Sequence, residues 1–177
     1  MSEMIIINVI NPLIQQLDYK SSLKQIFFET STRKIFNNQA ERDDFEWKYL
    51  GFYLAHYPQF AWVAIDNGIV LGYVLGMPYS KDPSLYQIQP HMKKFESLFD
   101  IFPGHLHINC HINARGKGIG KRLVLNLLHQ MKVFDVKGLH IMTGVHADNR
   151  FFYHKLGFDF EHSEDSILFM GIDLRDN

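Results

Sequence analysis

The feature that most constrains the fold is a glycine-rich turn between an alternating strand and an amphipathic helix. Apolar and polar side chains alternate over residues 106–112, which is the period of a β-strand with two different faces. The sequence Arg-Gly-Lys-Gly-Ile-Gly follows at residues 115–120, and apolar residues then recur at helical spacing to about Val133. A tight turn that opens a helix leaves the first backbone amides without intrahelical acceptors.

The turn predicts a phosphate-binding site. Exposed amides and the helix dipole favour an anion at a helix start, and glycine lets the anion approach the backbone closely. Arg115, Lys117 and Lys121 add local positive charge to a chain whose formal net charge is −1. The alternative interpretation of this segment is a plain turn with solvated lysines.

A near-neutral chain has no general attraction to nucleic acid or to anionic membranes, so we expect neither as a partner.

Two common phosphate-binding patterns do not match this turn. A P-loop requires Ser or Thr after Gly-Lys, and here Arg122 follows. The dinucleotide pattern Gly-x-Gly-x-x-Gly also fails, because Gly116, Gly118 and Gly120 are spaced by two. The remaining pattern, Arg/Gln-x-x-Gly-x-Gly/Ala, is matched from Arg115 to Gly120 and resembles the pyrophosphate-binding signature of the GNAT superfamily of acyl-CoA N-acyltransferases.

A second segment strengthens this resemblance. Residues 149–158, Asn-Arg-Phe-Phe-Tyr-His-Lys-Leu-Gly-Phe, resemble the Phe-Tyr-x-Lys-x-Gly-Phe element of the superfamily, one helix and one strand after the turn. The resemblance covers about residues 60–175. Within the superfamily, residues 70–76 and 105–109 look like the acetyltransferase-like domain attached to some O-GlcNAcases and its stand-alone bacterial relatives.

The remaining periodicities predict an α/β fold, or α+β, with a mixed sheet and helices on both faces. The resemblance adds that the sheet splays centrally, and that residues 1–177 form a single acyl-CoA N-acyltransferase domain. Asn67 and Gly68 accept positive φ and predict a hairpin. Further strands are expected at 4–10, 61–65, 69–75, 139–143 and 166–173, and helices at 21–36, 41–56 and 149–156, the last one capped by Asp148 and ended by Gly157.

Residues 77–104 are expected to form an insertion between strands. The segment holds four of the six prolines and is too long for a plain loop, and a short helix is expected around residues 92–99. Its aromatic residues could line an apolar acceptor pocket: Tyr79, Tyr86, Phe95, Phe99 and Phe102. A packed connector explains them equally well.

The GNAT resemblance implies transfer of an acetyl group from acetyl-CoA, the co-substrate, to a primary amine that attacks the thioester directly. It also implies that the pantetheine arm binds the backbone of Ile108 and Cys110, and that the pyrophosphate binds the amides of the turn. The expected cofactor-binding residues are Ile108, Asn109, Cys110, Arg115, Gly116, Lys117, Gly118, Ile119, Gly120, Lys121 and Asn149.

Two residues are predicted to be catalytic. Tyr153 matches the superfamily tyrosine that protonates the departing thiolate, although it could also be a core tyrosine. The O-GlcNAcase-attached group has an aspartate at the position of Asn109, and an amide cannot accept a proton. We therefore choose His107 as the general base, with a histidine tucked under the insertion as the alternative.

The last motif departs from the superfamily pattern. The family asparagine usually stands seven residues before the tyrosine, where this chain has His146, whereas Asn149 is only four residues before Tyr153. With Asn109, this departure favours a rival hypothesis, a non-catalytic acyl-CoA-binding or regulatory module.

A protein lysine acetyltransferase is a third possibility, but a neutral chain does not favour basic protein tails, so we expect a small-molecule amine as acceptor.

No metal is expected. His105, His107 and His111 share one face of their strand, but alternation puts Cys110 on the other face, and zinc needs three or four converging ligands. A single cysteine excludes an intrachain disulfide, and the N-terminal residues do not resemble a signal peptide. We therefore expect a cytoplasmic monomer or homodimer.

Overall fold

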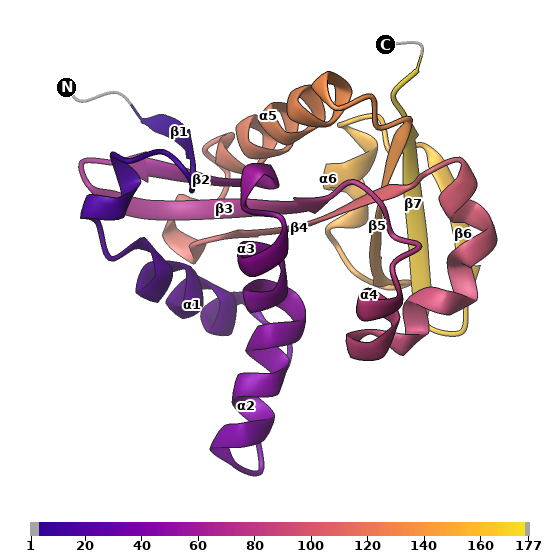
Figure 1. Ribbon diagram of the computed structural model, residues 1–177, viewed down its shortest axis with the longest axis horizontal. Helices are drawn as coiled ribbons and strands as arrows, with labels where there is room; N and C mark the ends of the chain where they lie inside the picture. Colours follow the sequence, from indigo (N-terminus) through magenta and orange to yellow (C-terminus); the bar gives the residue numbers. More distant parts are fainter. Residues whose placement is uncertain (1–3, 176–177) are drawn as a thin grey trace. The chain divides into compact units, whose positions relative to one another are not determined.

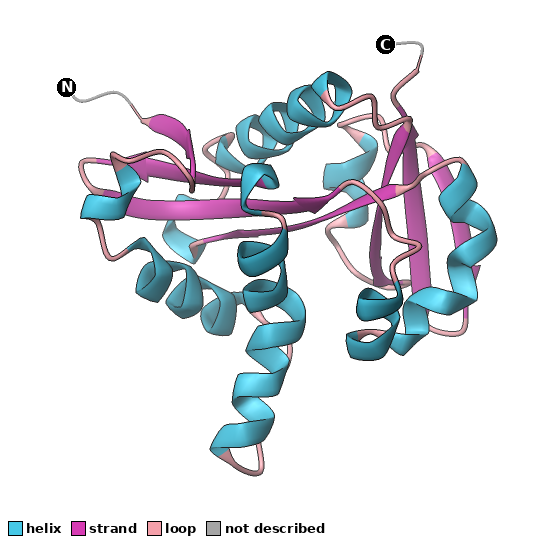
Figure 2. Ribbon diagram, in the orientation of Figure 1, coloured by secondary structure: helices cyan, strands magenta, loops and turns pink. Residues whose placement is uncertain are grey.

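The computed structural model describes residues 4–175 and divides into two compact units. The first unit comprises residues up to 76 together with 107–127, and the second comprises 77–106 together with 128 onward. Within these described residues, hydrogen bonds connect seven strands in the order β1-β2-β3-β4-β5-β7-β6. Figures 1 and 2 show the strands and helices of each unit. Parallel and antiparallel pairs both occur, so the predicted mixed sheet of an α/β fold is confirmed.

The first unit is built on an antiparallel meander. Strands β1 (Ile5–Asn8), β2 (Ala61–Asp66) and β3 (Ile69–Met77) pair in sequence, with Ile7 opposite Val63. The β2–β3 hairpin is confirmed, because Asn67 and Gly68 have φ of 49° and 77°. The expected buried strand at residues 4–10 is wrong in its burial: β1 is an edge strand, and the side chain of Ile5 is 50% exposed.

The helices of the first unit follow the sequence prediction with one correction. Helix α1 (Tyr19–Thr30) begins at Asp18, whose carboxylate accepts from the Ser21 amide, and it ends six residues earlier than expected. The expected helix at 41–56 is confirmed as three continuous segments: α2 (Gln39–Glu46), a π-helical turn, η2 (Trp47–Gly51), and α3 (Phe52–His56). Two 3-10 turns, η1 (Ile14–Gln16) and η3 (Pro58–Phe60), connect these helices to the strands.

Strand β4 (Gly104–Cys110), the 3-10 turn η5 (Ile112–Ala114) and helix α5 (Ile119–Val133) form the predicted strand, turn and helix. The division between the units falls within β4 and again within α5. The parallel pairing of β4 with β5 (Gly138–Gly144) comprises Gly104 with Leu139 and His105 with His140. The central splay concerns the relation between the two units, and it stays a prediction, as does the single domain.

The second unit contains the C-terminal strands and the insertion. Strand β7 (Ile167–Asp173) pairs antiparallel with β5 and with β6 (Phe160–Glu164). Helix α6 (Arg150–His154) is shorter than predicted and begins after Asn149 rather than Asp148. Gly157 has a φ of 89°, which confirms it as the stop after this helix. Within residues 4–175, no helix is both long and apolar enough to cross a membrane.

The insertion contributes much of the core of the second unit. It forms α4 (Pro83–Ile88) and the 3-10 segment η4 (Pro90–Asp100). Phe95 stacks on Phe169 with ring centroids 5.7 Å apart, and Phe99 stacks on His140 at 4.8 Å. Phe102 is 4% exposed, whereas Tyr79 is 54% exposed. Three of the five aromatic residues are thus core residues, and a role of the insertion in acceptor binding stays a prediction.

Gly171 of β7 lies against the buried ring of Phe102, and this contact allows a direct test of the packing of the core. A Cβ at this position would lie 2.7 Å from Cε1 of Phe102. We expect Gly171→Ala to lower the free energy of unfolding by about 1–3 kcal/mol, because the buried ring must shift to make room. Urea unfolding measures this change.

Gly144→Ala is the matched control, because a Cβ there meets nothing within 4 Å. Its effect should stay within about 0.5 kcal/mol. Equal losses in the two variants would contradict the packing of Phe102 on Gly171.

Candidate functional site

The backbone of β4 presents alternate residues to its two edges. The His111 amide donates to the Leu71 carbonyl at 2.9 Å, so the backbone amides and carbonyls of residues 107, 109 and 111 point toward β3. A Cβ on Gly72 would lie 2.9 Å from the Asn109 carbonyl, which shows how closely the two strands approach. The amides and carbonyls of Ile108 and Cys110 therefore point away from β3. This is the edge that the predicted pantetheine contacts require.

His107 lies against Tyr49 of η2 and Tyr53 of α3. Its Nε2 is 3.0 Å from the Tyr53 hydroxyl, and its ring meets the Tyr49 ring edge-on at a centroid distance of 5.8 Å. Tyr53 is fully buried, while His107 is half-buried. The partner of His107 is thus α3 of the first unit, and its role as a base stays a prediction.

Asn109 has a structural partner at each end of its amide. Its Nδ2 donates to the Tyr73 hydroxyl at 2.8 Å, and its Oδ1 accepts from Thr30 Oγ1 at 2.9 Å. Tyr73 is fully buried, and burial raises the pKa of its phenol. The amide of Asn109 therefore satisfies a buried hydroxyl and connects β3, β4 and α1, which gives this side chain a structural role.

The other polar residues of this strand region have separate partners. Nδ1 of His111 accepts from the Asn113 amide at 3.2 Å, and its Nε2 is 3.4 Å from Glu29 Oε2. His105 belongs to the second unit, where its Nδ1 lies 2.8 Å from Ser80 Oγ. Among the described residues 4–175, no three His, Cys, Asp or Glu side chains are grouped so that they could hold a metal ion.

The glycine turn has the conformation that close approach of an anion requires. Gly116 and Gly118 both have a φ of 75°, and a Cβ at either position would meet nothing within 4 Å. Residues 115–118 are exposed, as are Lys121 and Arg122. The Arg122 amide donates to the Gly118 carbonyl at 3.1 Å and so begins the intrahelical ladder of α5. The amides before it face the turn, so this arrangement fits a bound pyrophosphate.

Tyr153 and Asn149 lie on the second unit. Tyr153 is 6% exposed, and its ring packs on Phe158 at 5.6 Å. Asn149 is exposed, and its side-chain oxygen accepts from Thr143 Oγ1 at 3.0 Å. His146 is also exposed. The proton-donor role of Tyr153 and the cofactor role of Asn149 stay predictions.

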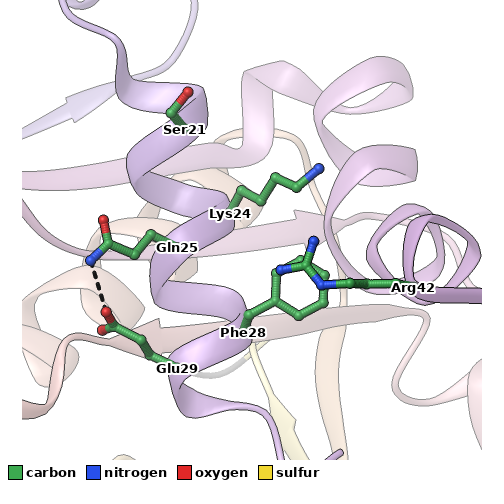
Figure 3. Close-up of a pocket in the computed structure, with 6 residues that line it drawn as sticks. All are labelled: Ser21, Lys24, Gln25, Phe28, Glu29 and Arg42. Carbon is green, nitrogen blue, oxygen red and sulfur yellow. Dashed lines mark hydrogen bonds between the residues drawn. The ribbon is translucent and has the colours of Figure 1, made fainter. Parts of the chain in front are cut away.

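A pocket of about 530 Å³ lies between α1 and α2, and none of its lining residues was predicted from the sequence (Figure 3). The Arg42 guanidinium lies over the Phe28 ring at 3.6 Å, and Gln25 donates to Glu29 at 2.8 Å. The lining residues are Ser21, Lys24, Gln25, Phe28, Glu29 and Arg42. These are ordinary positions on helix surfaces, so no sequence signal could have indicated the pocket.

Sequence reasoning also missed the tyrosines that hold the polar face of β4. Tyr49 and Tyr53 stand four residues apart in the helix predicted at residues 41–56, so they lie on one face of it. This spacing predicts that the two rings contact a common neighbour, but it does not predict which residue that is. Tyr73 lies in a strand whose register was unknown. Only the pairing of β3 with β4 could reveal its contact with Asn109.

Residues 21–158 match the Acetyltransferase (GNAT) family. The chain belongs to the GNAT acetyltransferase family. No curated protein matches it in sequence. The narrower resemblance to the O-GlcNAcase-attached group stays a prediction.

Solved structures share the fold. The crystal structure of SsHAT has a TM-score of 0.80 at 18% identity and covers 99% of this chain and 100% of that one. PH1933 from Pyrococcus horikoshii OT3 has a TM-score of 0.71 at 16% identity, with 97% and 98% covered. The putative acetyltransferase yncA from Salmonella typhimurium, solved with acetyl-CoA, has a TM-score of 0.63 at 15% identity, with 99% and 96% covered.

The thiol of Cys110 supplies a pH-dependent test of β4. Burial raises the pKa of Cys110 to about 11. Because only the thiolate is alkylated, we expect iodoacetamide to react with the native chain at pH 8 on the order of 10²-fold more slowly than with an ordinary thiol of pKa about 8.5. Mass spectrometry of the alkylated chain measures the rate.

The same chain in concentrated urea is the control, since its exposed thiol should reach its full rate at a pH near 9. The native rate should keep rising toward a pH of about 11. A native rate that levels off below pH 9 would show that the Cys110 thiol is not desolvated.

Proposed function

We propose that this chain is an N-acetyltransferase that transfers the acetyl group of acetyl-CoA to a primary amine by direct attack. The observation that carries the proposal is the exposed turn at the start of α5, in which Gly116 and Gly118 adopt positive φ and leave the backbone unobstructed. The acetyl-CoA bound in the yncA structure supports the same assignment of the co-substrate.

The first unit supplies two kinds of contact for acetyl-CoA. The amides of residues 116–121 can donate to the pyrophosphate, and Arg115, Lys117 and Lys121 add positive charge around it. The backbone of Ile108 and Cys110, which points away from β3, can pair with the amide groups of the pantetheine arm in the manner of an added strand. Together these contacts would hold the thioester along β4.

The transfer step needs orientation and two proton movements. Acetyl-CoA supplies an acetyl group activated as a thioester. The acceptor amine attacks the carbonyl carbon, the C–S bond breaks, and one proton must leave the nitrogen while one reaches the sulfur. We assign removal of the amine proton to His107 and protonation of the sulfur to Tyr153. The acceptor is proposed to be a small-molecule amine rather than a protein.

A second candidate is an acyl-CoA-binding module without turnover. It is favoured by Asn109, whose amide is engaged with Thr30 and Tyr73 and cannot accept a proton. The five-residue length of α6 favours it as well. In this case the chain would bind acetyl-CoA and never release CoA thiol.

A screen of primary amines for release of CoA thiol separates these two functions. The enzyme hypothesis requires thiol release that depends on at least one amine and saturates with its concentration. Calorimetry with acetyl-CoA runs in parallel. Tight binding with no thiol release across polyamines, amino acids, amino sugars and lysine peptides would favour the binding module, and no binding at all would reject both.

We expect Gly120→Glu to weaken acetyl-CoA binding at least tenfold, or about 1.4 kcal/mol. The substitution places bulk and negative charge at the second residue of α5, where the pyrophosphate is proposed to bind. Gln130→Glu makes the same change of charge near the other end of this helix and should leave the affinity unchanged. An unchanged affinity in folded Gly120→Glu would exclude the turn as the cofactor site.

We expect Tyr153→Phe to lower kcat on the order of 10²-fold, because the variant keeps the packed ring and loses only the acidic proton. The acetyl-CoA affinity and the Tm should barely change. Tyr19→Phe is a matched control, since Tyr19 is also 6% exposed. Normal turnover with a lower Tm would identify the Tyr153 hydroxyl as structural.

A further inference from the structure

We infer that His111 is a positioning residue for acetyl-CoA, because its side chain caps the segment that leads into the glycine turn. The inference rests on the proposed function, in which this turn binds the pyrophosphate. It goes beyond that function by naming a residue that acts on the cofactor through the conformation of the turn rather than by direct contact.

The backbone of His111 joins the end of β4 to the start of η5. Its amide donates to the Leu71 carbonyl of β3 at 2.9 Å, and its carbonyl accepts from the Ala114 amide at 2.9 Å. Ala114 is 2% exposed, and Ile119, the first residue of α5, is 3% exposed. The exposed glycine turn therefore lies between two buried residues, and His111 connects the first of them to the sheet.

The imidazole of His111 adds a hydrogen bond that fixes the same segment. Its Nδ1 accepts from the Asn113 amide at 3.2 Å, which makes His111 the side-chain cap of η5. A backbone amide can only donate, so Nδ1 carries a lone pair in this contact. The first amides of a helical turn have no acceptor within the turn, and a side chain that accepts from one of them stabilises the turn.

A carboxylate on α1 favours the same form of the ring. Oε2 of Glu29 lies 3.4 Å from Nε2 of His111, and Oε1 of Glu29 accepts from Gln25 at 2.8 Å. A neutral imidazole carries one ring proton. Because Nδ1 is an acceptor, that proton resides on Nε2, where it faces the anionic carboxylate. Both contacts of the ring are therefore consistent with one tautomer, and α1 holds the ring in the orientation that the cap requires.

The cap affects the cofactor because a turn that binds an anion does so best when its amides already have one direction. The amide of Arg115, the residue after η5, donates to the Ile112 carbonyl at 3.3 Å, so the glycine turn continues directly from the capped segment. Without the cap, the amides after Arg115 would sample several directions. Binding of acetyl-CoA would then have to order them, so its affinity would fall while the chemical step stayed the same.

Calorimetry with acetyl-CoA and the kinetics of CoA-thiol release test this role in the full chain. We expect His111→Ala to weaken acetyl-CoA binding about fivefold, the usual effect of losing a side-chain cap. The KM for acetyl-CoA should rise, and kcat with a saturating amine should stay the same. His111→Asn is the rescue variant: its side-chain oxygen can accept from the amide two residues on, so its affinity should be that of the native chain. His129→Ala, which removes an exposed histidine of α5, is the control and should change neither quantity.

Nuclear magnetic resonance of the ¹⁵N-labelled chain tests the cap itself. At a pH of about 8.5 an ordinary imidazole is neutral, and we expect the ring of His111 to be protonated at Nε2 and not at Nδ1. Hydrogen exchange at the Asn113 amide should be faster in His111→Ala and slow again in His111→Asn. A native ring protonated at Nδ1 would overturn the proposal, and so would a fivefold loss of affinity in His111→Asn. If His111→Ala does not fold, His111→Gln replaces it, because glutamine is not among the preferred cap residues.

The proposed function and this inference fail in different ways. A native chain that binds no acetyl-CoA would reject both, and calorimetry of the native chain alone shows this. Equal affinity in the native chain and in folded His111→Ala would keep the proposed function and reject the positioning role of His111. A lower kcat at an unchanged KM in His111→Ala would place His111 in the chemical step and would also overturn the proposal.

Discussion

The candidate site depends on the two-residue period of β4. Alternate backbone groups face opposite edges of a strand, and alternate side chains face opposite sides of its sheet. The His111 amide bonds to β3, which leaves the backbone of Ile108 and Cys110 for a ligand. The same period directs His107 and Asn109 toward the helices of the first unit. A shift of one residue in the pairing of β4 with β3 would exchange both sets of groups at once.

Buried phenols give this region its polar character. Tyr53 and Tyr73 are fully buried, and each places its hydroxyl within hydrogen-bond distance of a β4 side chain. A buried hydroxyl without a partner costs about 1–3 kcal/mol, so the contact of Asn109 with the buried Tyr73 hydroxyl contributes to stability. The amide of Asn109 meets this requirement, whether or not the chain is an active enzyme.

Local signals in the sequence were sufficient for the hairpin at Asn67 and Gly68, for the glycine turn and for α5, because each depends on backbone preferences within a few residues. The helix expected to reach residue 36 ends at Thr30, and Ile35, which lies in the part expected to be helical, is 83% exposed. The aromatic insertion looked like a pocket wall, yet Phe95 and Phe99 pack in the core. Burial of this kind depends on partners such as Phe169 and His140 that are distant in the sequence. The partners of His107 and Asn109 were hidden for the same reason.

The π-helical turn between α2 and α3 holds one residue more than an α-helical turn would. That residue allows Phe45 before it to pack on Phe27 while Tyr53 after it reaches His107. In an uninterrupted α-helix each residue turns the chain by about 100°, so removing one residue here would rotate one of these two side chains away from its neighbour. The number of residues between Phe45 and Tyr53 is therefore restricted as well as their identity. A chain without the extra residue would have to position His107 by other contacts.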